Sequence, residues 1–250
     1  MTDIQTLILS LDAADGTDRR QAALALGAVR DDAVVGALLD RLRVEPDSRV
    51  REDLTWAVVQ HAEPAHPRLV AMLADDDPAQ RRTAAHVLSK VASSDDFDAV
   101  APLVADPDAD VAIKAYRAAA NTGGERAVGV LAARLGDGDL LQRDALTNAL
   151  ATVGEPAVPA LVAALSSDDA VVREHAAETL GHLGGPEADA AAPALEALTS
   201  DAVPAVRLAA VAALGQLAFA ADEPLRRIAD GDDPLLAQLA SRFADDRKVA

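Results

Sequence analysis

The sequence predicts an all-α solenoid of about seven and a half repeated helix pairs, and two observations carry this prediction. Half of the 250 residues are aliphatic, aromatic or alanine, yet the chain has only one Trp, one Tyr and three Phe. This composition suits closely packed helices, because Ala and Leu are strong helix formers. In addition, one motif recurs about every thirty residues, and its apolar positions have helical spacing.

The repeat is clearest when the copies are aligned on one anchor position. Successive anchors are 30 to 34 residues apart, at Arg19, Arg51, Arg81, Ala112, Arg143, Arg173, Arg207 and Ala237. The third and seventh residues after every anchor are apolar, and so is the twelfth residue before each anchor except the first. Each repeat therefore contains two helices with one apolar face each. One such pair cannot bury its own apolar face, so neighbouring repeats must stack.

An aspartate stands four residues before the anchor in seven of the eight copies. These residues are Asp15, Asp47, Asp77, Asp108, Asp139, Asp169 and Asp233. A residue directly before a helix accepts hydrogen bonds from backbone N–H groups of the first turn, and a negative charge suits that end of the helix. We interpret these aspartates as helix caps. They predict one domain over residues 1–250, with repeats that begin near 15, 47, 77, 108, 139, 169, 203 and 233.

The motif Asp-x-x-x-Arg-x-x-Ala-x-x-x-Leu-Gly is clearest in DAVVREHAAETLG, residues 169–181, and poorest at Ala112 and Ala237. It resembles HEAT repeats, of the short type named after phycobilisome lyases, over nearly the whole chain. The resemblance implies a right-handed α–α superhelix of seven to eight helix pairs. It also implies that ladders of these aspartates and of Arg19, Arg51, Arg81, Arg143, Arg173 and Arg207 tie neighbouring repeats together. Such a motif specifies a fold and says almost nothing about function.

The charge of the chain argues against several classes of partner. The chain has 41 acidic and 23 basic residues, and its net charge of −18 repels nucleic acid and anionic lipid. Three of the basic residues are lysine. An aspartate-rich, lysine-poor surface is typical of proteins that work in molar salt, so we expect a halophilic archaeal source rather than an acidic mesophilic one. We see no signal peptide and no apolar run of eighteen residues, and therefore expect a cytoplasmic protein without membrane insertion.

Residues for catalysis or metal binding are hard to find in this sequence. It has no cysteine, and its paired carboxylates recur at the turns between repeats, where helix capping explains them. His61 and His66 flank a proline-containing segment, and a weak metal site formed by these two histidines stays an alternative. We expect the polar side chains particular to residues 166–184 to face solvent, namely Glu174, His175, Glu178 and His182. We assign no catalytic residue, no metal ligand and no cofactor.

The resemblance to HEAT repeats raises three enzyme classes as alternatives. Deoxyhypusine hydroxylase binds two irons through His-Glu dipeptides, and this chain has none, since Glu174-His175 is the reverse order. HEAT-like DNA glycosylases use a basic groove, which the charge argues against. Bilin lyases remain the alternative, although no feature of the sequence identifies a tetrapyrrole pocket.

The best candidate for a binding surface is a nearly uncharged stripe on the second helices, which we expect to line the concave side of the solenoid. It comprises Pro102, Gly129, Ala133, Pro159, Ala163, Pro193 and Ala197, with Arg126 and Arg134 beside it. Exposed apolar patches mark interaction sites, although small residues here could equally serve helix packing. The sequence therefore predicts a non-catalytic protein-interaction scaffold or adaptor, with a signalling or chemotaxis-type assembly as one setting. The alternative is an enzyme or enzyme-accessory factor of the bilin-lyase-like class.

Overall fold

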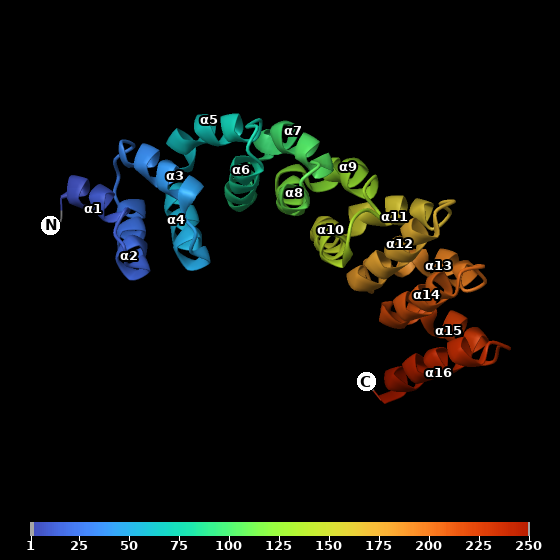
Figure 1. The fold of residues 1–250 in the computed structure, drawn as a ribbon. Helices are drawn as coiled ribbons and strands as arrows, with labels where there is room; N and C mark the ends of the chain where they lie inside the picture. Colours follow the sequence, from blue (N-terminus) through green and yellow to red (C-terminus); the bar gives the residue numbers. More distant parts are fainter. Residues whose placement is uncertain (1–2, 250) are drawn as a thin grey trace. The chain divides into compact units, whose positions relative to one another are not determined.

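The protein is an all-helical α-solenoid in a computed structural model that describes residues 3–249, with the backbone alone for Phe219 and residues 246–249 (Figure 1). Within this part of the chain there are α-helices and 3₁₀-helices and no strand. A short helix, α1 (Ile4–Ser10), precedes the first repeat. The ends of the predicted 1–250 domain lie outside the described residues.

Each of the first seven repeats consists of a long first helix and a shorter second helix, and the eighth has a first helix alone over the described residues. The first helices are α2 (Gly16–Gly27), α4 (Ser48–Gln60), α6 (Pro78–Val91), α8 (Ala109–Gly123), α10 (Leu140–Val153), α12 (Ala170–Leu183), α14 (Pro204–Gln216) and α16 (Pro234–Val249). The second helices are α3 (Val34–Val44), α5 (Ala62–Met72), α7 (Phe97–Val100), α9 (Val128–Ala132), α11 (Val158–Ala164), α13 (Ala192–Leu198) and α15 (Asp222–Ala229). Every repeat start expected from the sequence is the residue directly before a first helix.

Short 3₁₀ turns lead into the second helices from the third repeat onward. They are η1 (Ser94–Asp96), η3 (Gly124–Ala127), η4 (Glu155–Ala157), η5 (Asp189–Ala191) and η6 (Phe219–Ala221), and η2 (Ala101–Ala105) continues α7. Prolines such as Pro159 and Pro193 stand in the first turn of their α-helices. Proline is tolerated there because a first-turn N–H has no partner within the helix.

The aspartate column caps the first helices. The Asp47 carboxylate accepts hydrogen bonds from the N–H groups of Arg49 and Val50, at 2.8 and 3.4 Å. The corresponding donors are Thr17 for Asp15, Ala79 for Asp77, Val111 for Asp108, Gln142 for Asp139, Val171 for Asp169, and Leu235 and Leu236 for Asp233. These backbone donors are the main reason that the pKa values of Asp15 and Asp77 are lowered. Each capped helix start follows directly from the local sequence.

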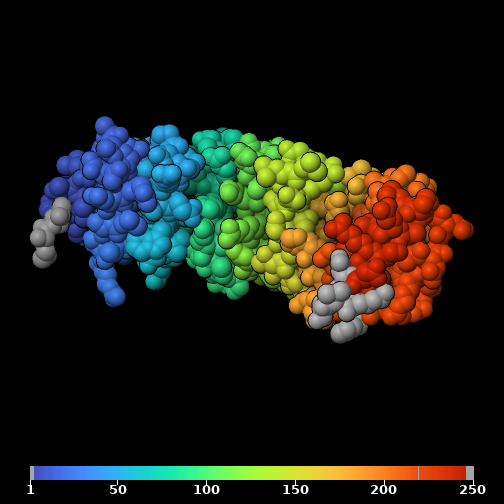
Figure 2. All heavy atoms as spheres, turned by 90° about the horizontal axis from the view of Figure 1, so that it is seen from below, coloured from blue at the N-terminus to red at the C-terminus, as the bar shows by residue number. Residues whose placement is uncertain are grey.

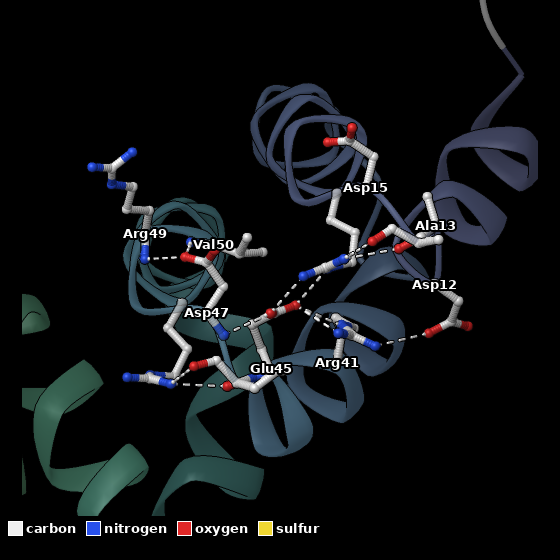
Figure 3. A network of polar contacts seen from close by, with 12 residues as sticks. Asp12, Ala13, Asp15, Arg41, Glu45, Asp47, Arg49 and Val50 are labelled. Carbon is white, nitrogen blue, oxygen red and sulfur yellow. Dashed lines mark hydrogen bonds and ion pairs between the residues drawn. The ribbon is translucent and has the colours of Figure 1, made fainter.

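The anchor arginines link the turn before their own helix to the end of the same repeat. Arg19 binds Glu45 through two hydrogen bonds, Nε to Oε2 at 2.8 Å and Nη2 to Oε1 at 2.9 Å, and its Nη1 donates to the carbonyls of Ala13 and Ala14 (Figure 3). Arg81 binds Asp106 and Arg173 binds Asp201 in the same bidentate way. This planar, two-bond geometry is the strongest form of the arginine–carboxylate contact.

The other anchor arginines also donate hydrogen bonds to backbone carbonyls of the turn before their helix. Arg51 donates to the carbonyls of Glu45 and Pro46, and Arg143 to that of Gly138. Arg207 donates to two turn carbonyls and lies 3.8 Å from Asp233. The bidentate acids Glu45, Asp106 and Asp201 stand two residues before a cap position, in a column that the sequence reasoning did not use. The capping aspartates themselves mainly serve their own helices.

Contacts between Cα atoms divide the described chain into two units, one up to Ala118 and one from Ala119. The division falls within α8, in a repeat whose anchor is Ala112 in place of arginine. Within each unit, consecutive repeats lie side by side in sequence order, as successive bands of colour in the space-filling view (Figure 2). One continuous solenoid over 1–250 stays a prediction.

Each unit has two layers of helices, and the prediction that the second helices line the concave side was wrong. The inner layer holds α2, α4 and α6 in the first unit and α10, α12, α14 and α16 in the second, while the second helices form the outer layer (Figure 1). Small residues allow a close approach between two pairs of these inner helices. A Cβ on Gly27 would lie 2.9 Å from Cα of Ala57, and one on Gly181 2.9 Å from Cα of Ala213. At these two contacts, α2 packs closely against α4 and α12 against α14.

The core lies between the two layers and consists mainly of leucine, valine and alanine. The third residue after each anchor is buried in every repeat, from Ala22 to Ala240. Tyr116 is fully buried in the fourth repeat, at a position where most repeats have a small or aliphatic side chain. The polar caps and arginine links thus enclose a continuous apolar seam in each unit.

Candidate functional site

The stripe expected from the sequence lies on the solvent side of the outer layer. Its prolines, alanines and glycine are exposed, namely Pro102, Gly129, Ala133, Pro159, Ala163, Pro193 and Ala197. Arg126 is exposed, and Arg134 is half-buried in an ion pair with Asp137 at 2.6 Å. Pro159 also lines an outer hollow of about 370 Å³ together with Glu125, Glu155 and Glu187. The stripe as a binding surface remains a prediction.

A larger hollow lies on the inner layer of the second unit, between α12, α14 and α16. It measures about 740 Å³, and most of its floor is aliphatic: Ala205, Leu208, Ala209, Ala212, Ala213 and Leu239. Glu174, Glu178 and His182 form its side on α12. The alanines are short, so the floor leaves room for the side chains of another molecule.

A second hollow of about 280 Å³ adjoins the first, because Glu174, Glu178 and His182 line both. Leu140, Arg143, Asp144 and Thr147 of α10 and His175 of α12 complete its lining. We call the two hollows together the inner groove. The groove therefore runs across the inner layer from α10 to α16, with an acidic part on α10 and α12 and an aliphatic part from α12 to α16.

The acidic part of the inner groove carries more negative than positive charge, because Asp144, Glu174 and Glu178 line it together with Arg143. Glu174 and Glu178 are one helical turn apart, a spacing at which like charges repel. The pKa of Glu178 is raised, first because burial disfavours its charged form and second because Glu174 is close. Among the ion pairs of the described residues, none joins Asp144, Glu174 or Glu178 to a basic side chain.

On the inner layer of the first unit, acidic side chains form ion pairs with basic side chains of the neighbouring first helix. Glu52 accepts from Lys90 at 2.9 Å, and Arg82 lies 3.2 Å from Asp110. Glu52 occupies the same position after its anchor as Glu174 does. The fold therefore pairs these acids directly with cations in the first unit, whereas in the second unit Arg143 acts on Glu178 through its charge without forming an ion pair with it.

The expectation that His175 faces solvent was wrong, because its side chain is buried in the seam between α10 and α12. Nδ1 accepts a hydrogen bond from the Gly136 N–H at 3.0 Å, and Nε2 lies 3.2 Å from the Arg143 carbonyl and 3.0 Å from Oγ1 of Thr147. Because Nδ1 accepts, the ring is neutral and carries its proton on Nε2. Burial lowers the pKa of His175 and favours this neutral form. His175 is thus a structural residue beneath the groove.

The two histidines of the open metal pair have separate partners. His61 is buried and donates from Nε2 to the Leu26 carbonyl at 3.1 Å, whereas Nε2 of His66 lies 2.6 Å from Oδ1 of Asp96. Over the described residues, no three His, Asp or Glu side chains gather in a way that could hold a metal ion. Over the same residues, no helix is both long and apolar enough to span a membrane.

A family model for HEAT repeats matches residues 66–151, 139–215 and 159–244. The chain belongs to the HEAT-repeat family. No curated protein matches it. The match covers the repeats that build the inner groove, so the groove is part of the repeat array rather than of an added domain.

Solved structures similar to this HEAT-repeat protein include enzymes and a much longer chain. Human deoxyhypusine hydroxylase is 20% identical with a TM-score of 0.41, over 99% of this chain and 96% of that one. A chain of the CpcE–CpcF complex of phycocyanin lyase from Nostoc sp. PCC7120 is 21% identical with a TM-score of 0.45, over 98% and 95%. Kap121p is 15% identical with a TM-score of 0.59, over 96% of this chain and 33% of its own. The last of these likenesses shows the fold alone.

Proposed function

We propose that this HEAT-repeat protein is a non-catalytic scaffold or adaptor that binds another protein in the inner groove. The observation that carries the proposal is the open aliphatic floor formed by Ala205, Leu208, Ala212 and Leu239 on the inner layer. At the other end of the groove, Leu140 is 80% exposed and its neighbour Leu141 65% exposed. Leucines that the fold leaves exposed at the edge of a groove are typical of interaction surfaces.

The use of the remaining polar residues supports a scaffold over an enzyme. The aspartate column caps helices, the arginines link turns and carboxylates, and His175 is held neutral by Gly136 and Arg143. These residues are engaged in holding the repeats together. A catalytic base or nucleophile needs a side chain within reach of a substrate, and the side chains best placed for this are the carboxylates of the groove.

The composition supports a setting for this function. A net charge of −18 with three lysines suits the cytoplasm of a salt-accumulating cell, for which a halophilic archaeon is our proposal. A signalling or chemotaxis-type assembly is one place where such an adaptor would act. Molar salt leaves hydrophobic contacts intact, so an aliphatic groove remains an effective binding surface under those conditions.

Affinity capture from a lysate kept in molar KCl tests the proposal. The bait is the full chain, and the inner variant carries Leu208→Glu and Ala212→Glu. The matched outer variant carries Ala133→Glu and Ala163→Glu on the predicted stripe, with the same change in net charge. We expect the wild type and the outer variant to retain the same partner and the inner variant to lose it, with thermal melting as the check that all three are folded. If only the outer variant loses the partner, the placement of the binding site in the inner groove is refuted. If no partner is captured at all, the scaffold function is refuted.

Metal analysis and an absorbance scan of the purified protein separate this proposal from its alternative. Stoichiometric iron or a bound chromophore would favour an enzyme or an enzyme-accessory factor of the bilin-lyase-like class.

A further inference from the structure

We infer that the occupant of the inner groove is a basic amphipathic helix, with lysine or arginine against Asp144, Glu174 and Glu178 and an aliphatic side chain against Leu208. This inference rests on the proposed function and adds the chemistry of the partner. It follows from the two unlike parts of the groove and from the distance between them.

The acidic part favours a cation. Asp144, Glu174 and Glu178 come from the two neighbouring helices α10 and α12 and line one hollow, in which Arg143 offsets part of their negative charge. In the first unit, Lys90 fills the corresponding role beside Glu52. A lysine or arginine of a partner would form charge-assisted hydrogen bonds with these carboxylates and relieve the repulsion between Glu174 and Glu178. A second copy of this chain is a poor occupant, because its own net charge is −18.

The aliphatic part favours a helix. Its floor between α12 and α16 consists of Ala205, Leu208, Ala209, Ala212 and Leu239, whose side chains neither donate nor accept hydrogen bonds. A segment laid on such a floor must satisfy its own backbone N–H and C=O groups, and an α-helix does so internally. An extended peptide would leave many of these groups unpaired, since the inner layer offers no strand edge.

The packing of the inner layer gives the spacing of the two features. Packed helices lie about 8–10 Å apart, so the acidic part between α10 and α12 and the aliphatic part beyond α12 are separated by about one helix spacing. An α-helix advances about 1.5 Å per residue, so about seven residues, or two turns, cover this distance. The partner helix should therefore carry its basic residue about two turns from its aliphatic residue on the same face.

Selection from a library of displayed helical peptides tests this inference. The library varies one face of an alanine-based helix of about 18 residues, long enough to cross three inner helices. The full chain is the target, at the lowest KCl concentration at which its melting curve shows a folded protein. We expect enriched peptides to carry lysine or arginine about two turns from leucine, isoleucine or methionine.

Two triple variants with the same change in net charge then locate the binding site by fluorescence anisotropy. The inner variant, Asp144→Asn, Glu174→Gln and Glu178→Gln, should weaken binding of a selected peptide by at least about tenfold, as expected for lost charge-assisted contacts. The outer variant, Glu125→Gln, Glu155→Gln and Glu187→Gln, should bind within about twofold of the wild type, since it changes only distant surface charge.

Several results would overturn the inference. They are enrichment of peptides without basic residues, enrichment of extended sequences, equal binding by both triple variants, or no enrichment at all. Suppose that the Leu208→Glu and Ala212→Glu variant loses its cellular partner, while the selected peptides lack basic residues or are extended. The inference then fails and the proposed function stands. If no partner is captured, the proposed function itself fails.

Discussion

Replacing Glu45 by glutamine should destabilise the first unit through the loss of one buried carboxylate. The Glu45 side chain is fully buried and accepts from Arg19, from Arg41 at 2.6 Å and from the Asp47 N–H at 2.9 Å (Figure 3). Burial by itself raises the pKa of Glu45, but these donors outweigh it and lower the value from 4.5 to about 2. The carboxylate is therefore more stable in the folded chain than in the unfolded one.

The size of the effect follows from this pKa. A lowering from 4.5 to about 2 corresponds to about 3.4 kcal/mol, at about 1.36 kcal/mol per pKa unit. The arginine partners of Glu45 are partly exposed, and screening reduces their interactions, so we expect Glu45→Gln to cost about 2 kcal/mol. Because the folded pKa is the lower one, this stability is fully present above about pH 4.5 and is lost as the pH falls toward about 2.

Urea denaturation followed by circular dichroism measures this effect. The matched control is Glu63→Gln, the same chemical change at an exposed position of α5, which should stay within about 0.5 kcal/mol of the wild type. The difference between Glu45→Gln and the wild type should be largest near neutral pH and shrink steadily below about pH 4.5. A cost below about 0.5 kcal/mol, or a difference independent of pH, would refute the account of Glu45 as the centre of this network.

Three further predictions concern packing, protonation and salt. Gly181→Ala should cost about 1–3 kcal/mol in urea denaturation, because the new Cβ would lie 2.9 Å from the Ala213 backbone, whereas Gly129→Ala, with open space around it, should be neutral or stabilising. Equal effects would contradict the close packing of α12 on α14. Burial lowers the pKa of His175 below 6.5, so its stabilising effect should be complete above that pH and decline as the pH falls below it. Melting curves of the wild type and His175→Gln should therefore converge on acidification, and parallel curves would refute this. Finally, the melting temperature should rise with KCl concentration, because salt screens a net charge of −18, and a falling one would argue against self-repulsion.

The start of each repeat could be predicted because local chemistry determines it. Asp169, for example, stands before a run with helical apolar spacing, and in the structure its carboxylate accepts from the Val171 N–H at the start of α12. Leu180 and Ala176 are buried for the same reason, since they recur on one face of that helix. Features that depend on the residues of one repeat alone, such as helix caps and buried apolar positions, can thus be predicted from the sequence.

The order of the two layers and the inner groove depend on contacts between repeats. The apolar spacing within one helix does not predict such contacts. Close contacts between first helices, such as Gly181 on Ala213, join residues of different repeats. Burial of His175 requires the Gly136 N–H, 39 residues earlier in the chain. A possible signal for the arginine partners was present, since Glu45, Asp106 and Asp201 all stand two residues before a cap position. Comparing the copies at that column would have found them.

The arginine links also bear on how such a chain can change in length. A block from one cap to the residue before the next, such as residues 169–202, contains both Arg173 and its acid, Asp201. Towards the preceding block, Arg173 uses the backbone carbonyls of Ser167 and Asp168, and every sequence offers such carbonyls. The arginine link of such a block is therefore kept when the block is duplicated, deleted or exchanged, whereas contacts between the first helices of neighbouring blocks, such as His175 with Thr147, still have to match. Cap-to-cap segments are the natural units for recombining this scaffold.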